Sequence, residues 1–177
     1  MKQIWKKSLS LTLTLCMLIA LMPQLALPAK ADLADTMTDL YESVLTDGGA
    51  APTSGVYSIS SDTELYLLAE YVNAGKSNEG LTFCLDDDIV LNDVSHADEW
   101  NDGTEGLNAW APIGTNSNYF RGTFDGGGHT VSGIYISASD SDYQGLFGYL
   151  RSGATVENVG VADSYIMGDS YVGGVAG

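Results

Sequence analysis

Short segments that recur along the C-terminal part of the chain limit its fold more than any other feature. Residues 130–136 (TVSGIYI) resemble residues 155–161 (TVENVGV) at an offset of 25, and residues 145–148 (GLFG) resemble residues 174–177 (GVAG) at an offset of 29. Two pieces that recur in the same order at nearly one period indicate a solenoid, propeller or array. A unit this short cannot bury its own apolar face, so we expect neighbouring units to stack through parallel strands about 4.8 Å apart.

The residue pattern inside each unit predicts a mainly β fold, namely a right-handed parallel β-helix preceded by N-terminal α-helices. Glycine supplies the left-handed backbone conformations that sharp corners need, and Asp125 can hydrogen-bond back to the turn that follows it. We expect corner glycines at Gly126, Gly128, Gly145, Gly148, Gly173 and Gly174. We expect Val131, Ile134, Phe147, Val156 and Val159 in the stacked interior.

Helical patterns precede the repeats. Residues 33–45 carry apolar side chains at helical spacing, and a second helix begins after Ser61, with Glu64 completing a capping box. A strand over 81–91, broken by three aspartates, and a polar loop over 92–108 follow. The predicted organisation is a signal peptide (1–31), a short helix and linker (32–55), an N-terminal cap of strand, helix, strand and polar loop (56–108), and stacked coils (109–177). Because the coils stop at residue 177 without a polar cap, we expect a truncated, C-terminally open portion of a longer protein.

The first 31 residues have the three parts of a cleavable signal peptide. Basic residues begin the chain, an apolar stretch spans 9–22, and Ala29, Lys30 and Ala31 form the cleavage site. Hydroxyl side chains dilute the apolar stretch, and it ends before the roughly 20 residues that a membrane span needs. The sequence therefore predicts a secreted or surface-attached protein with no membrane span after cleavage.

The mature chain is strongly acidic. Only Lys76, Arg121 and Arg151 remain against 23 acidic residues once the leader is removed, which gives a net charge of −20. Such a surface repels phosphate backbones and anionic lipids, so nucleic acid is not expected as a partner. Cys84 is then the remaining cysteine and lies in an apolar segment, so we expect a small packed hydrophobe and no intrachain disulfide.

The sequence contains no recognisable catalytic pattern. It lacks H-E-x-x-H, paired C-x-x-C and phosphate-binding loop motifs. His129 lies in a glycine turn beside Asp125, and packing against the next coil is favoured over a nucleophile–base pair with Ser132. Polysaccharide lyase chemistry needs a basic residue beside an acidic sugar polymer, which this acidic surface repels. No catalytic residue, cofactor site or metal ligand is assigned.

Calcium and sugar are the two ligands for which the sequence offers partial patterns. The acidic runs 86–88 and 140–142 supply oxygen ligands, but neither has EF-hand spacing, so solvated loops are favoured and calcium is not assigned. Aromatic side chains could form a sugar-binding face, although stacked aromatic ladders in the interior explain their alternation better. These residues are Trp100, Trp110, Tyr135, Tyr143, Tyr149, Tyr165 and Tyr171.

Several motifs in order resemble bacterial extracellular proteins with GLUG-motif repeats. They are WAPIG at 110–114, FRGTFDGGGHTV at 120–131, GLFG at 145–148 and VGGVAG at 172–177. The resemblance covers roughly residues 56–177, and Gly127 departs from it, since that family usually has asparagine there. Similar segments occur in surface adhesins, S-layer-associated proteins and the non-catalytic N-terminal region of immunoglobulin A peptidases. The resemblance implies a β-helical surface stalk.

The prediction from sequence is a non-catalytic, secreted or cell-surface structural or adhesive module. Its expected partner is a glycan or protein ligand on a host or on the cell wall. The alternative is the N-terminal portion of an extracellular hydrolase, in the first instance a protease, whose catalytic domain lies downstream. The helix over 33–45 is outside the resemblance and receives no role.

Overall fold

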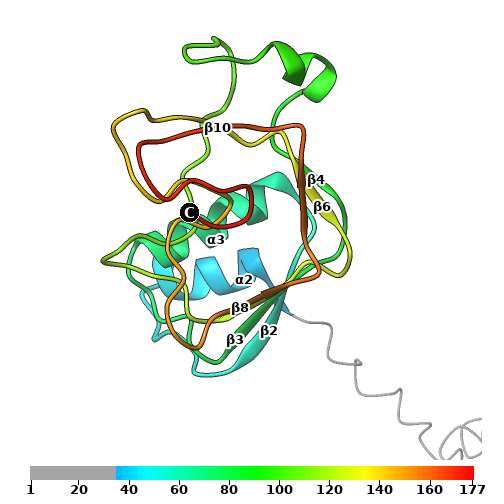
Figure 1. The fold of residues 1–177 in the computed structure, drawn as a ribbon. Helices are drawn as coiled ribbons and strands as arrows, with labels where there is room; N and C mark the ends of the chain where they lie inside the picture. Colours follow the sequence, from blue (N-terminus) through cyan, green and yellow to red (C-terminus); the bar gives the residue numbers. More distant parts are fainter. Residues whose placement is uncertain (1–34) are drawn as a thin grey trace, which may run out of the picture. The chain divides into compact units, whose positions relative to one another are not determined.

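Three parallel β-sheets and two N-terminal helices make up the part of the chain that the structure, a computed structural model, describes, residues 35–177 (Figure 1). The signal peptide predicted over 1–31 lies outside the described residues. The helical segments are α2 (Met37–Tyr41), its π-helical continuation η1 (Glu42–Thr46), α3 (Asp62–Asn73) and the 3-10 segment η2 (Val94–Glu99). The strands are β1 (Asp35–Thr36), β2 (Gly55–Ile59), β3 (Leu81–Leu85), β4 (Ile89–Val90), β5 (Thr123–Asp125), β6 (Thr130–Ser132), β7 (Tyr135–Ser137), β8 (Thr155–Glu157), β9 (Gly160–Ala162) and β10 (Tyr165–Met167).

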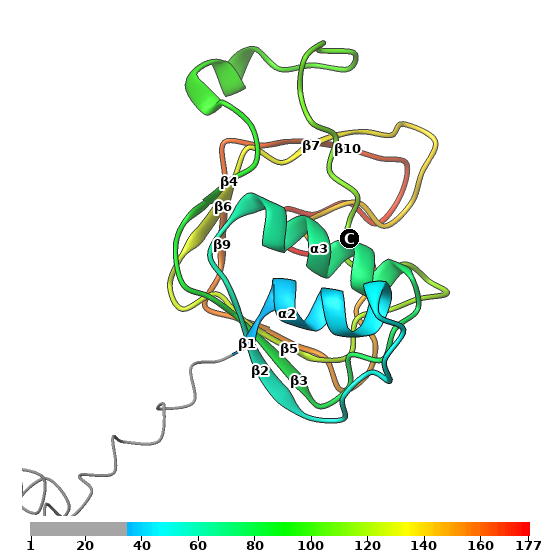
Figure 2. The same ribbon diagram turned by 180° about the vertical axis from the view of Figure 1, so that it is seen from behind.

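The strands pair in parallel in each sheet. The largest sheet has the order β1-β2-β3-β5-β8, the second has the order β4-β6-β9, and the third pairs β7 with β10. In both ribbon views the sheets lie on different sides of a common interior (Figures 1 and 2). The chain passes from one sheet to the next and returns to the first one strand further along. The parallel strands that the repeats predicted are therefore present.

The two helices make the fold mixed rather than mainly β. Helix α2 packs against α3, and the pair lies behind the strands in Figure 1 and in front of them in Figure 2, so it covers one end of the stack. Thr36 and Asp39 cap α2 reciprocally through their side chains. At α3 the Ser61 hydroxyl accepts from the Glu64 N–H at 3.3 Å, as predicted. The Glu64 carboxylate, however, accepts from the N–H of Ser60, one residue before the expected partner.

The strand register corrects one of the two sequence alignments. Phe147 lies opposite Ala176, which agrees with the alignment of 145–148 with 174–177. Thr130 lies opposite Gly160 instead of Thr155, because β6 and β8 belong to different sheets. A strand of alternating apolar residues fits either sheet, so the similarity of 130–136 to 155–161 reflects a shared strand pattern and does not fix the register.

The interior is filled by aromatic and aliphatic side chains from segments whose strands pair in parallel. Phe120 lies against Phe83 and Phe147, with ring centroids 6.0 Å and 5.1 Å apart. Three of the five predicted interior residues, Val131, Ile134 and Phe147, are fully buried. The other two, Val156 and Val159, are half-buried and pack against the core. The apolar pattern thus located the interior correctly.

The corner glycines have two different physical explanations. Gly128 has a φ of +90°, which confirms the left-handed conformation predicted for it. The other five predicted glycines lack a positive φ, so that part of the prediction was wrong. At Gly148 an added Cβ would lie 2.5 Å from the Gly114 carbonyl oxygen, so the close approach of these two segments requires glycine there. The same crowding by neighbouring atoms applies at Gly126, Gly145 and Gly173, and Gly174 is uncrowded.

Candidate functional site

The carboxylates and histidines that the sequence singled out do not gather into a metal-binding cluster among the described residues. Within residues 35–177, no group of three or more His, Cys, Asp or Glu side chains is placed to hold a metal ion. Asp88 accepts from the Thr130 N–H at 2.8 Å, and Asp142 accepts from the Ser170 N–H at 3.1 Å. Both acidic runs therefore supply side chains that hold the backbone of a neighbouring segment.

The turn around His129 does not form a nucleophile–base pair. His129 Nδ1 lies 3.4 Å from Asp88, and the Ser132 hydroxyl donates to the Ile89 carbonyl. Asp125 accepts from the Gly127 N–H at 3.0 Å, as predicted, and also from the Asn158 side-chain amide. The Asn158 and Gly127 hydrogen bonds lower the pKa of Asp125. This carboxylate stabilises the turn in its ionised form.

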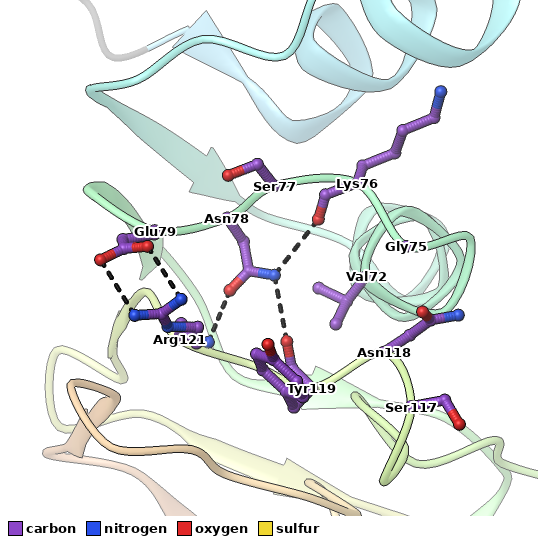
Figure 3. Close-up of a pocket in the computed structure, with 10 residues that line it drawn as sticks. All are labelled: Val72, Gly75, Lys76, Ser77, Asn78, Glu79, Ser117, Asn118, Tyr119 and Arg121. Carbon is purple, nitrogen blue, oxygen red and sulfur yellow. Dashed lines mark hydrogen bonds and ion pairs between the residues drawn. The ribbon is translucent and has the colours of Figure 1, made fainter.

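A cavity of about 200 Å³ lies where the end of α3 meets the loop over 115–121 (Figure 3). Sequence reasoning missed this cavity, because its two walls are roughly 40 residues apart and neither carries a known motif. Its walls combine polar, charged and aromatic side chains, and it is the candidate site of the described chain. The lining residues are Val72, Gly75, Lys76, Ser77, Asn78, Glu79, Ser117, Asn118, Tyr119 and Arg121.

Asn78 holds the two walls of the cavity together. Its side chain is 4% exposed, and its carbonyl oxygen accepts from the backbone N–H groups of Arg121 at 2.6 Å and Gly122 at 3.0 Å. Its amide nitrogen donates to the carbonyls of Lys76 and Tyr119, each at 3.3 Å. One buried amide thus links the two segments just before β3 and β5 begin to pair, and Figure 3 shows it between them.

Two further asparagines attach the end of α3 to the same region. Asn73 donates to the Pro112 carbonyl at 3.0 Å and accepts from the Gly114 N–H at 2.9 Å. Asn118 donates to the Asn73 carbonyl at 2.7 Å, which occupies one of the orphan carbonyls at the helix end. The helix and the first coil are therefore joined by side-chain amides, which hold the cavity in a fixed shape.

The three basic residues predicted to remain after leader cleavage gather around this cavity. Lys76 and Arg121 line it, and the guanidinium carbon of Arg151 lies 4.3 Å from the ring centre of Tyr119, another lining residue. Arg121 forms a two-pronged ion pair with Glu79, at 3.0 Å and 3.1 Å. The buried Nε of Arg121 has no hydrogen-bond partner among the described residues. The positive charge of an acidic protein is thus concentrated at one place.

The aromatic residues form stacked groups instead of one continuous face. Tyr143 stacks on Tyr171 with ring centroids 4.9 Å apart and an interplanar angle of 10°, and Tyr135 stacks on Tyr165 at 5.7 Å. Both pairs are stacked as the predicted ladders require. Tyr171 is 63% exposed, however, so the Tyr143–Tyr171 pair lies at the surface and the interior position predicted for it was wrong. Tyr143 and Tyr171 both have positive φ angles, 62° and 57°, which are unusual for bulky residues. Trp110 is buried, donates to the Leu146 carbonyl and contacts Tyr66. Trp100 packs edge-on against Tyr135. In the same way, Tyr149 packs edge-on against Tyr143.

Cys84 lies on β3 and is half-buried. Burial raises the pKa of its thiol, and the nearby carboxylates of Asp125 and Asp86 raise it further. A thiol with a raised pKa is a poor nucleophile, which agrees with its prediction as a packing residue.

No family model and no solved structure matches the chain. Two curated proteins do. A putative Gly-rich membrane protein of Evansella cellulosilytica is 31% identical over 119 residues, which is 67% of this chain and 12% of that protein. Halomucin of Haloquadratum walsbyi is 32% identical over 130 residues, which is 73% of this chain and 1% of that protein. The chain therefore spans a small part of the relatives it matches.

Proposed function

We propose that this chain is a structural or adhesive module of a secreted or cell-surface protein, built as a right-handed parallel β-helix and without catalytic activity of its own. The observation behind the proposal is that equivalent residues lie opposite one another on successive parallel strands. Thr82, Thr123 and Thr155 lie opposite one another on three successive strands, and the positions after them are Phe83, Phe124 and Val156. A parallel register of this kind can be extended by further repeats, which suits a spacing or display module.

The relatives support the surface location in the proposal. One is named as a Gly-rich membrane protein and the other as a halomucin, and both matches cover about two thirds or more of this chain. The predicted leader and the acidic mature sequence agree with export. The resemblance to GLUG-motif repeat proteins belongs to the same proposal, since it implies a surface stalk of stacked coils.

The polar groups that the sequence singled out support a structural role over a catalytic one. Asp88 accepts from the Thr130 N–H, Asp125 accepts from the Gly127 N–H of its own turn, and the Ser132 hydroxyl donates to the Ile89 carbonyl. A nucleophile beside an oriented base is the arrangement that hydrolysis requires. Ser132, the serine considered as a nucleophile, donates instead to a backbone carbonyl.

Export and surface display test the proposal directly. The gene is expressed in a bacterial host with its leader, and a variant lacking residues 2–31 serves as the matched control. We expect antibody to label intact cells, or to detect the protein in the medium, with a mature N-terminus at Asp32. The control should remain inside the cell. An uncleaved parent protein that stays in the cytoplasm would contradict the proposal.

A further inference from the structure

The basic residues of the described chain all lie at or beside the cavity near α3. After the predicted leader, three basic residues stand against 23 acidic ones. All three basic residues line the cavity or contact its Tyr119 wall, and Glu79 is the one acidic residue among its lining side chains. Elsewhere the acidic surface repels an approaching anion, and screening limits that repulsion to about 8 Å at physiological salt. An anionic group can therefore approach the protein here.

Two of the three positive charges are available to a ligand. Glu79 neutralises Arg121 through two contacts, whereas Lys76 and Arg151 form no ion pair with any described residue. The Lys76 side chain is extended in Figure 3, with its amine directed away from Asn78. Its flexible stem allows the ammonium group to swing to a ligand at the cavity mouth. Arg151 is held over the Tyr119 ring at 4.3 Å and cannot move as freely.

The remaining lining groups are those that recognise a sugar ring. The Ser117 hydroxyl, which donates to Asn116, offers its oxygen as an acceptor, and Asn118 offers an amide oxygen. Tyr119 supplies an aromatic ring for apolar contact. The volume of about 200 Å³ is below the roughly 300 Å³ at which sites for larger small molecules begin. The cavity therefore fits a single sugar unit, and the acidic surroundings disfavour a chain of acidic sugars.

We propose that this cavity binds the carboxylate of one hexuronate, either the free acid or a single acidic unit in an otherwise neutral glycan. Lys76 and Arg151 supply the charge, and Ser117, Asn118 and Tyr119 contact the ring. That the acid comes from a surface glycan rests on the proposed surface function. The anion site itself does not depend on that location.

Titration of the full chain with glucuronate, observed by NMR of the backbone amides of 75–79 and 117–121, tests the proposal. Glucose is the neutral control ligand. We expect glucuronate to bind, Lys76→Gln and Arg151→Gln each to weaken binding about threefold, and the double variant about tenfold. His96→Asp, on the loop that projects from the body in Figures 1 and 2, lowers the net charge by one, as each single variant does, and should leave the affinity unchanged.

Glu79→Gln keeps the test independent of folding defects. It releases the Arg121 guanidinium from its ion pair and should tighten glucuronate binding, a gain that a misfolded protein cannot produce. A disaccharide of one uronate and one neutral sugar that binds more tightly than the free acid would identify a glycan as the source; the reverse order would identify the free acid. The proposal is overturned if glucuronate shifts no resonance in either the parent or the Glu79→Gln protein. Equal binding of glucose, or an equal loss in His96→Asp, also overturns it. None of these outcomes affects the export test.

Discussion

Replacing Asn78 with alanine would remove the acceptor for two backbone N–H groups at the junction of α3 and the first coil. The Gly122 N–H is buried, and the Arg121 N–H is partly buried. A buried donor left without a partner lowers the free energy of unfolding by about 1–3 kcal/mol. The full loss at the Gly122 N–H and a part of it at the Arg121 N–H give a total of about 3 kcal/mol. Since the free energy of unfolding of a small domain is about 5–15 kcal/mol, this single change removes a large fraction of the stability.

Urea unfolding followed by tryptophan fluorescence measures this loss, because Trp100 and Trp110 are both buried in the folded chain. With an m-value of about 2 kcal/mol/M, a loss of about 3 kcal/mol lowers the midpoint by about 1.5 M. The matched control is Asn116→Ala. Asn116 is exposed on the loop over 115–121 and accepts only from the Ser117 hydroxyl, at 3.3 Å. Its loss should stay within about 0.5 kcal/mol. If Asn78→Ala lost less than about 1 kcal/mol, or no more than Asn116→Ala, the bridging role assigned to Asn78 would be wrong.

Three further changes test the fold. Gly148→Ala should lower the free energy of unfolding by about 1–3 kcal/mol through overpacking. Gly174→Ala should be near neutral, because the nearest atom to its new Cβ is 3.9 Å away. Equal urea midpoints for the two variants would refute the crowding argument. Gly128→Val should cost more than about 1 kcal/mol because φ is +90°, and an unchanged thermal midpoint would count against that conformation. Burial raises the pKa of Tyr71 from 10.0 to about 12, so its contribution to stability is complete below pH 10 and is lost as the pH rises through about 12. Tyr71→Phe should therefore flatten the fall of the urea midpoint between pH 10 and 12, and an identical fall in both proteins would refute the shift.

Local patterns predicted local structure well. Ser61 caps α3 as expected, because a hydroxyl before an apolar helical stripe satisfies the first free N–H groups. The three aspartates after Leu85 separate β3 from β4, where the chain turns from one sheet to the next. The strand register was harder to predict. Residues 130–132 and 155–157 have the same apolar alternation, and the different lengths of the corners decide which strands become neighbours.

The candidate site could not have been found from the sequence. Asn78 and Asn118 are ordinary loop residues by composition, and their partners lie on segments 41 to 45 residues away in the chain. The gathering of Lys76, Arg121 and Arg151 depends equally on how the coils stack. The net charge of the mature chain indicated only that a polyanion is an unsuitable partner, and the place where a single anion can approach appeared with the tertiary structure.

The all-parallel pairing also has a consequence for how the chain reaches its folded state. None of the described strand pairs can close as a local hairpin. Hydrogen bonds between neighbouring segments join residues 30 or 33 positions apart, and the bond from Gly114 to Asn73 on α3 joins residues 41 positions apart. Loops of this size close slowly, and each new coil needs the preceding one as a template. The helices α2 and α3, which form from local contacts, provide the first surface. Assembly should therefore proceed from the N-terminal end toward the C-terminal end, the same order in which an exported chain emerges from a secretion channel.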